Sequence, residues 1–399
     1  MKKIIFSILG ILIIGIILIV ILTKKTEEPV IEDYSYVMVE DNIILDVNQK
    51  YYLKDYVTIK EGELEDSLID TSFIGKKEQE VYYNADNMRR KFMFNYEVVD
   101  KVKPLILGGG SLTFRVNSEP ELIYSFFSAD NYDPNPKREI IGEYDLNQIG
   151  SYNLEFKVTD SSGNYSSKKF TLHINKGISN PPKPPAEKPK VEYEKIYQEH
   201  KSKNTLIGLD VSKWQGEIDF DLLKENKVEF IMIRVGYQKG FDGEYLIDPF
   251  FERNITEANR VGIPVGGYFY TYAKTPVEAR EQALWVVNNV KDYKVTYPLV
   301  YDFESWKSIP KHNLSLDGLN NLAKIFMDTV NELGYKGMNY SSKYYLNHIW
   351  NLNDYPVWLA HYTKKTDYEG PYDIWQLTDS GKIPGINGDV DVNVMYLNK

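Results

Sequence analysis

The residues best suited to chemistry in this sequence are two acids at the end of the apolar run Leu299-Val300-Tyr301-Asp302-Phe303-Glu304. The run predicts a β-strand, so Asp302 and Glu304 point to one face of it, about 6.5 to 7 Å apart at Cα. Two carboxylates on an inward face are costly to bury unless they are paired, protonated or used, and no basic residue lies within the strand. The pair is therefore the first candidate for catalysis.

Two neighbouring carboxyl groups push their pKa values apart, so one can stay protonated near neutral pH while the other is ionised. Cleavage of a glycosidic bond needs one protonated and one ionised carboxyl group. Glu304 is the better proton donor, because it is nearer the strand's carboxyl end and has the longer side chain, whereas Asp302 would stabilise positive charge or orient the substrate. Retaining and inverting geometries both remain open.

Two further acids lie at strand ends. Asp210 closes the run Ile207–Val211, and Asp391 lies in the segment Asp389-Val390-Asp391-Val392-Asn393. An isolated Asp in such a place is more often a helix cap or a turn former, so neither indicates chemistry by itself.

Aromatic residues favour a sugar substrate, because flat rings stack on sugar faces. Those at or just past predicted strand ends are Trp214, Tyr268, Tyr270, Tyr340, Trp358, Tyr362 and Trp375. Ordinary packing is the alternative for each ring in a chain with 32 Tyr.

From residue 204 to 399, short apolar strands alternate with helical segments, a pattern typical of parallel βα units. Active sites of parallel barrels lie at the carboxyl ends of the strands, which is where the four acids fall. We expect an irregular α/β (TIM-like) barrel with about five helices and eight strands, at 206–211, 230–235, 264–270, 298–304, 337–340, 357–360, 374–377 and 390–394.

This region resembles the glycoside hydrolase family 25 lysozymes, the Chalaropsis-type or phage-type muramidases. The matching segments occur in the family's order: 208–216 (GLDVSKWQG), 265–270 (VGGYFY), 298–304 (PLVYDFE), 358–362 (WLAHY), 374–377 (IWQL) and 388–393 (GDVDVN). Phe269 departs from the pattern, since many relatives have His there.

The resemblance implies cleavage of the β-1,4 bond between N-acetylmuramic acid and N-acetylglucosamine in peptidoglycan, with no cofactor and no metal. By motif, Glu304 looks like the general acid/base and Asp302 like its partner, which steers the N-acetyl group or stabilises the transition state. Asp210 and Asp391 look like supporting acids. Tyr268, Tyr270, Tyr340, Trp358, Tyr362, Trp375 and Gln376 are the expected substrate-binding residues.

The N-terminal half predicts an anchor, a stalk and a spacer. Residues 4–22, within 1–29, contain no charge and at about 28 Å are long enough to cross a bilayer. Alternating apolar residues and the echo of 70–75 at 145–150 predict tandem all-β sandwiches at 30–101 and 102–176, the second resembling bacterial Ig-like domains. Residues 177–203 predict a proline-rich linker. The expected fold class is thus multidomain: membrane helix, Ig-like sandwiches and barrel.

Composition excludes several alternatives. With no Cys among 399 residues, thiolate nucleophiles, disulfides and Cys-ligated metals are absent. A formal charge of -10 argues against nucleic-acid binding. The five His show no spacing that suits a zinc peptidase or amidase.

Two hypotheses remain. The first is a single-pass membrane-anchored muramidase whose catalytic domain works outside the cytoplasm, in the wall of a Gram-positive bacterium, with the Ig-like domains meeting other envelope proteins. The second is a non-catalytic scaffold that binds glycan. The presence of all four acids favours the first.

Overall fold

The computed structural model describes residues 30–177, 189–352 and 354–397. They fall into two compact units, one ending at Lys101 and one beginning at Val102. Within the described ranges no helix combines the length and apolar character needed to cross a bilayer. The predicted membrane span, residues 4–22, lies outside these ranges.

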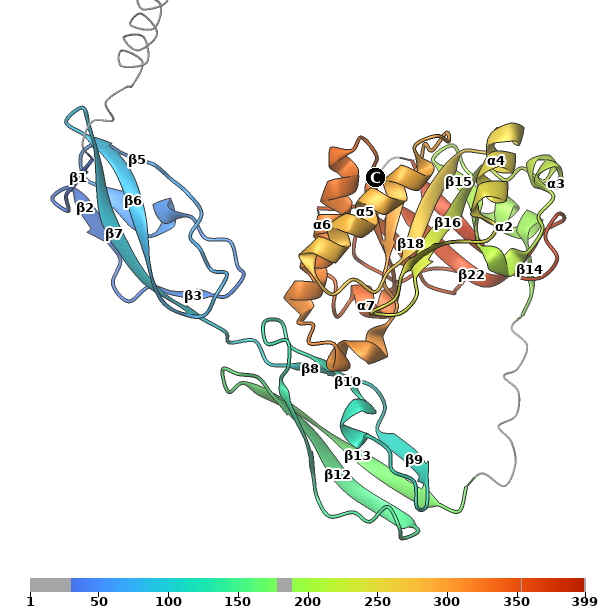
Figure 1. The fold of residues 1–399 in the computed structure, drawn as a ribbon, viewed down its shortest axis with the longest axis horizontal. Coiled ribbons are helices and arrows are strands. Elements are labelled where there is room, and N and C mark those ends of the chain that lie inside the picture. Colours follow the sequence, from blue (N-terminus) through green and yellow to red (C-terminus); the bar gives the residue numbers. More distant parts are fainter. Residues whose placement is uncertain (1–29, 178–188, 353, 398–399) are drawn as a thin grey trace, which may run out of the picture. The chain divides into compact units, whose positions relative to one another are not determined.

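The first unit is built around a long hairpin of β6 and β7 (Figure 1). Buried positions alternate with exposed ones along both strands. Its sheet has the order β1-β7-β6-β5, and β3 also pairs with β7; β2 and β4 form a separate two-stranded sheet. The strands are β1 (Ile31–Glu32), β2 (Val37–Val39), β3 (Ile44–Asp46), β4 (Val57–Ile59), β5 (Glu63–Leu64), β6 (Gly75–Ala85) and β7 (Met88–Val99), with a 3₁₀ turn η1 (Leu53–Asp55).

The second unit opens with a sheet of the same plan, in the order β11-β12-β13-β9, beside a two-stranded β8-β10 sheet. In both sheets the second hairpin strand has a short parallel neighbour, β3 on β7 and β9 on β13. The elements are β8 (Leu105–Leu107), β9 (Ser111–Arg115), η2 (Leu122–Tyr124), β10 (Phe127–Ala129), β11 (Lys137–Ile141), β12 (Gly150–Thr159) and β13 (Tyr165–Asn175).

These sheets correct the predicted fold class. We expected tandem antiparallel Ig-like sandwiches, but each domain has one mixed sheet with parallel edge strands and a small two-stranded sheet. Alternation in the sequence identifies the buried face of a strand but not the direction of its neighbour, which is why the parallel strands were not predicted. The described chain is mostly strands, with few helices and without a membrane-spanning one.

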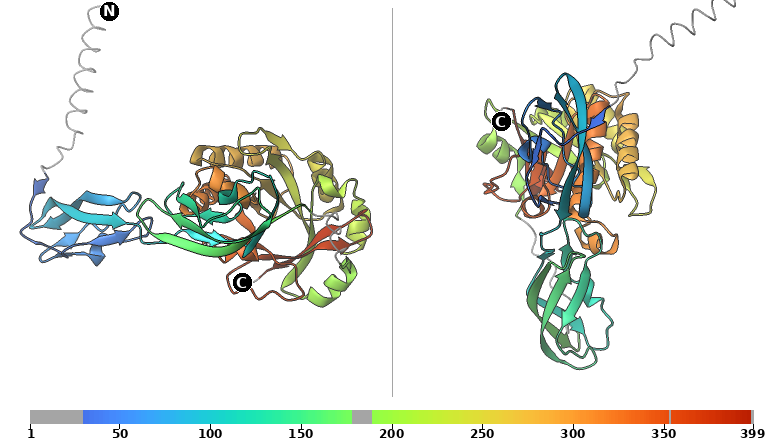
Figure 2. Two further views of the ribbon diagram at one scale, coloured as in Figure 1. Left: turned by 90° about the horizontal axis from the view of Figure 1, so that it is seen from below. Right: turned by 90° about the vertical axis from the view of Figure 1, so that its left-hand side faces the viewer.

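The rest of the second unit contains a closed eight-stranded barrel, and Figures 1 and 2 show its strands curving around one axis. The strand order is β22-β21-β20-β19-β18-β16-β15-β23, and β23 pairs back with β22. Strand β23 runs antiparallel to both of its neighbours. The barrel strands are β15 (Thr205–Val211), β16 (Phe230–Gln238), β18 (Val265–Tyr270), β19 (Leu299–Asp302), β20 (Gly337–Ser342), β21 (Val357–Ala360), β22 (Ile374–Lys382) and β23 (Val390–Tyr396).

Helices pack against the outside of these strands, with α4 against β16 and β18 and α6 against β19 and β20. The Thr275 hydroxyl caps α5 by accepting from the Glu278 N–H, and Gly262 ends α4 in a left-handed conformation that suits glycine. The remaining elements are η3 (Lys213–Gln215), α3 (Phe220–Glu225), β17 (Tyr245–Ile247), α4 (Phe251–Val261), α5 (Pro276–Val290), η4 (Trp306–Lys311), α6 (Leu316–Glu332) and α7 (Lys343–Leu346).

The barrel is packed on both sides of its strands. Apolar side chains such as Phe230, Met232 and Val300 form an interior cluster, while a larger cluster lies between strands and helices. Gly266 makes room inside, since a Cβ there would lie 2.5 Å from the Met232 sulfur. The interior is therefore filled below the mouth where the acids lie.

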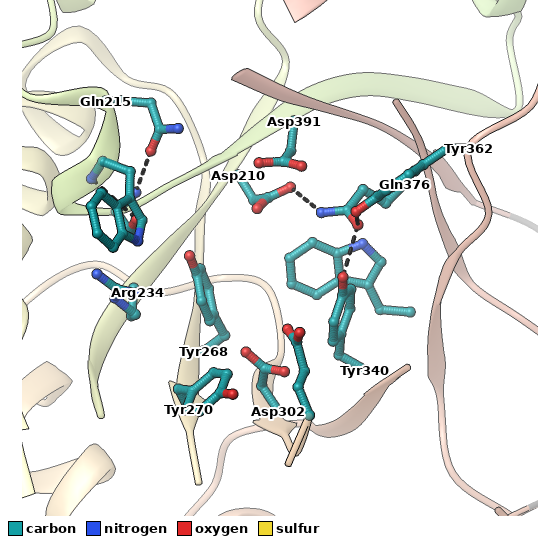
Figure 3. A pocket seen from close by; sticks show the side chains of 14 residues that line it. Asp210, Gln215, Arg234, Tyr268, Tyr270, Asp302, Tyr340, Tyr362, Gln376 and Asp391 are labelled. Atoms are coloured by element: carbon teal, nitrogen blue, oxygen red, sulfur yellow. Dashed lines mark hydrogen bonds between the residues drawn. The ribbon is translucent and has the colours of Figure 1, made fainter. Parts of the chain in front are cut away.

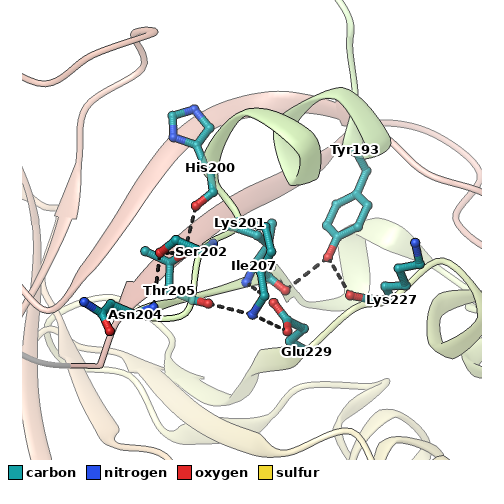
Figure 4. Close-up of polar contacts among 9 residues, drawn as sticks. All are labelled: Tyr193, His200, Lys201, Ser202, Asn204, Thr205, Ile207, Lys227 and Glu229. Atoms are coloured by element: carbon teal, nitrogen blue, oxygen red, sulfur yellow. Dashed lines mark hydrogen bonds and ion pairs between the residues drawn. The ribbon is translucent and has the colours of Figure 1, made fainter.

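The folded barrel unit begins earlier than residue 204. Strand β14 (Val191–Glu192) pairs with β22, and α2 (Tyr193–His200) buries Tyr193 and Ile196 in the barrel's core cluster. Figure 4 shows the Tyr193 hydroxyl donating to the carbonyls of Ile207 and Lys227. Part of the segment predicted as linker thus belongs to the barrel's fold.

Candidate active site

Asp302 and Glu304 lie in one cavity of about 280 Å³ at the barrel mouth. Asp302 ends β19 and is 4% exposed, whereas Glu304 follows the strand and is accessible to solvent. The two carboxyl groups share a hydrogen bond, so one of them carries its proton. Strand geometry therefore brings the two acids together on one face, as their spacing predicts.

The pKa values of both acids are raised. Desolvation, and after it the charge of Glu304, raises the pKa of Asp302 well above its ordinary value. Desolvation in the cavity also raises the pKa of Glu304, although the hydrogen bond with Asp302 opposes the shift. The pair can thus hold one proton under conditions in which two ordinary carboxyl groups are both ionised.

Asp210 and Asp391 lie together across the pocket from Asp302 (Figure 3). They are direct partners in the pairing of β15 with β23. Desolvation raises the pKa of Asp210 to about 6 and that of Asp391 to about 9, the latter helped by the charge of Asp210. Of the two acids, Asp391 holds its proton the more strongly.

A hydrogen-bond network holds Asp210 in place. Its Oδ2 accepts from Gln376 Nε2 at 3.0 Å and from Asn393 Nδ2 at 2.7 Å. The hydroxyls of Tyr340 and Tyr362 donate to Gln376 Oε1 at 2.9 and 3.2 Å, which fixes the orientation of that amide. Trp358 Nε1 donates to Asn393 Oδ1 at 2.8 Å, which fixes the orientation of the Asn393 amide. The network thus presents two N–H donors to the carboxylate.

Six of the seven predicted substrate-binding residues line this cavity, namely Tyr268, Tyr270, Tyr340, Trp358, Tyr362 and Gln376. Trp214 stands at its edge with 76% of the side chain exposed.

Trp375 does not line the cavity, which corrects its predicted role. It is 3% exposed, and its Nε1 donates to the His361 carbonyl at 2.8 Å. Neighbouring residues of a strand face opposite sides, so Gln376 points inward and Trp375 points toward the helices. The same alternation turns Phe269 outward against Trp285, away from the cavity.

Sequence reasoning missed Arg234 on β16. Its side chain lines the cavity, and its Nε donates at 2.7 Å to Asp248, which is 1% exposed. The available signal was a charged residue in the apolar strand Phe-Ile-Met-Ile-Arg-Val, in phase with the inward-facing Phe230 and Met232. Gln215 and Ser212, on and before η3, also line the cavity without having been predicted.

Comparison with known proteins identifies the fold's family. The family described as glycosyl hydrolases family 25 matches residues 209–386. The uncharacterised protein YegX of Escherichia coli K12 is 32% identical over 195 residues, which cover 48% of this chain and 69% of YegX. The chain belongs to glycosyl hydrolase family 25. It is therefore a glycoside hydrolase of the lysozyme, or muramidase, class.

Other proteins that this chain resembles are less similar to it in sequence. The autolytic lysozyme of Clostridium acetobutylicum is 25% identical over 189 residues, covering 47% of this chain and 54% of that protein. The solved structure of the modular autolysin LytC from Streptococcus pneumoniae, in complex with a synthetic peptidoglycan ligand, is 27% identical with a TM-score of 0.44. That similarity covers 61% of this chain and 56% of LytC. The chain thus spans little more than half the length of these two relatives.

Proposed function

We propose that this family 25 chain cleaves the β-1,4 bond between N-acetylmuramic acid and N-acetylglucosamine in peptidoglycan, with Glu304 as general acid/base and Asp302 assisting. The observation that carries the proposal is the hydrogen-bonded pair of carboxyl groups in one cavity, with Asp210 and Asp391 opposite. A proton donor on one side and negative charge near the sugar on the other are what glycosidic cleavage requires.

Substrate binding would place the shared proton on Glu304, the proposed general acid. Asp302 and Glu304 share a hydrogen bond, and Asp302 Oδ1 has no hydrogen-bond partner among the described residues. An acetamide N–H of the substrate would donate to Asp302 and favour its ionised form, since hydrogen bonds to a carboxylate stabilise the charge. The shared proton then moves to Glu304, whose accessible carboxyl group can deliver it to the glycosidic oxygen.

Asp210 would supply fixed negative charge to the sugar ring as it becomes oxocarbenium-like. Its two amide donors hold it in position, so no reorganisation is needed during the reaction. Asp391, whose pKa is raised by desolvation and by the charge of Asp210, would act as a hydrogen-bonding group rather than supply charge. The tyrosines, Trp358 and Gln376 would form the walls that hold the sugar.

The proposed substrate lies outside the cytoplasmic membrane. We place the catalytic barrel outside the cytoplasmic membrane, in the peptidoglycan of a Gram-positive wall. The absence of Cys is consistent with a protein that holds together there by packing alone.

The test compares the full chain with its Glu304→Gln variant on purified peptidoglycan, by release of reducing ends. The variant keeps the size of the side chain but cannot donate the proton, so we expect a loss of over about a hundredfold, or about 3 kcal/mol of transition-state stabilisation. Glu281→Gln on the exposed face of α5 is the matched control and should retain full activity.

The other outcomes are also informative. Equal activity of the native chain and Glu304→Gln would refute the role of Glu304. Binding of glycan without cleavage by either protein would favour the scaffold hypothesis.

A further inference from the structure

A second cavity, of about 420 Å³, adjoins the first. Glu304, Tyr340 and Tyr362 line both cavities, so the proposed proton donor stands on the wall between them. The second cavity is otherwise formed by Trp306 of η4, by the end of β20 and the first residues of α7, and by the end of β21 with His361 after it. It therefore lies at the carboxyl end of the strands, on the same face of the barrel as the acids.

The chemistry of the two cavities differs. Asp210, Asp302 and Asp391 all line the first, and Glu304 is the sole acid lining the second. Positive charge develops on the sugar whose anomeric carbon is attacked, so that sugar belongs among the acids of the first cavity. A general acid protonates the oxygen between two sugars, and the departing sugar must then lie on the other side of Glu304.

One exposed ring belongs to the second cavity alone. Tyr362 is also exposed, but it lines both cavities and its hydroxyl donates to Gln376. Trp306 and Tyr345 stack on each other, with centroids 3.9 Å apart and planes 19° apart, and Trp306 is 7% exposed. Tyr344 instead meets its ring neighbours Tyr345 and His348 at 80° and 67°, and 47% of its side chain is exposed. Tyr344 is therefore the platform on which a sugar face could stack.

The second cavity presents little uncompensated positive charge. The Lys343 ammonium donates to Asp367, and the same carboxylate lies 3.7 Å from His361 Nδ1. His361 also makes a 2.9 Å hydrogen bond with Thr366. The cavity thus suits an uncharged, hydroxyl-bearing ring better than a sugar that carries an acidic peptide.

From this geometry we infer that the second cavity is the binding site for the departing sugar, an uncharged N-acetylhexosamine, and that Tyr344 is a specificity-determining residue there. The inference rests on the proposed function, in which the departing sugar is N-acetylglucosamine, the one without a peptide. It also sets the direction of the glycan strand, which runs from the Trp214 edge past Glu304 to Tyr344.

The test compares two substrates that share the sugar in the first cavity: a tetrasaccharide of two N-acetylglucosaminyl-N-acetylmuramic acid units, and that disaccharide's fluoride, whose leaving group is too small to fill the second cavity. For Tyr344→Ala we expect the ratio of kcat/KM for the tetrasaccharide over the fluoride to fall about three- to tenfold. Tyr344→Phe keeps the ring and should keep the ratio. Tyr165→Ala, which removes an exposed ring on β13, is the control.

An unchanged ratio in Tyr344→Ala would overturn the inference, as would an equal loss on both substrates. A second readout does not depend on catalysis: titration of the tetrasaccharide into Glu304→Gln and into Glu304→Gln/Tyr344→Ala should show weaker binding by the double variant. Failure of the native chain to cleave either substrate would refute the proposed function. Equal affinity of these two variants would refute the second cavity separately.

Discussion

Asp302 and Glu304 differ in environment although they end the same strand. Asp302 is buried beneath the cavity and Glu304 reaches its open side, so desolvation acts most strongly on the residue that is not expected to donate the proton. In our account, binding of the substrate to Asp302 shifts the shared proton to Glu304, the accessible acid. The residue-level chemistry therefore depends on the pair rather than on either acid alone.

This pair predicts a specific pH dependence. Because the pKa values of both acids are raised, the proton is present at low pH and is lost as the pH rises through the raised value. We expect kcat/KM on the tetrasaccharide to fall on an alkaline limb that lies above the range of an ordinary glutamate, about pH 4.3. The disaccharide fluoride needs no protonated leaving group, so its alkaline limb should be weaker. Identical limbs for both substrates would contradict the role of the proton.

Strand alternation explains which residues could be predicted. It places Asp302 with Glu304 on one face, and the acids at strand ends were found by that rule. Trp375 was chosen because it is aromatic and near a strand end, without regard to its face, and it proves to point outward. Arg234 lies on the inward face but was passed over, because its buried partner Asp248 is 14 residues away in sequence and only the fold brings the two together.

At the scale of elements, helix α2 was not predicted, and the sequence around it explains why. Its eight residues follow a proline-rich stretch and are mostly polar, with Tyr193 and Ile196 as the buried apolar positions. A helix this short gives little periodic signal, and its stability comes from packing rather than propensity. Lys201 then ties the following turn to the barrel by donating to the Thr205 carbonyl and to Glu229.

We predict that Ile196→Ala destabilises the barrel by about 2 to 5 kcal/mol, because it leaves a cavity in the main core cluster. Lys195→Ala, at the neighbouring exposed position, should change stability by less than about 0.5 kcal/mol. Urea unfolding followed by tryptophan fluorescence checks this, since all six Trp lie within residues 204–399. Similar midpoints for both variants would show that α2 does not contribute to the barrel's fold.

The positions of the eight barrel strands could be predicted because each is a short apolar run. The direction of β23 could not be predicted, because the apolar pattern of a strand is the same whether it pairs parallel or antiparallel. The same limit applied to β3 and β9, whose parallel pairing depends on contacts far apart in sequence. Sequence pattern thus predicted elements and faces better than neighbours.

At the scale of the whole molecule, the chemistry is concentrated in the last half of the chain. The two N-terminal sheets share one plan, a long hairpin with a short parallel strand beside its second strand, which agrees with the internal echo in the sequence. The family match is confined to the barrel and ends at residue 386, before Asp391. The place of Asp391 in the site therefore rests on the pairing of β23 with β15.

The most direct test identifies the new chain end that the whole protein makes. Purified peptidoglycan is digested with the full chain, the products are reduced with borohydride, and the reduced sugar is identified by mass spectrometry. Our account predicts reduced N-acetylmuramic acid from the native chain and almost none from Glu304→Gln. Reduced N-acetylglucosamine, or products with new peptide ends and intact glycan, would contradict it.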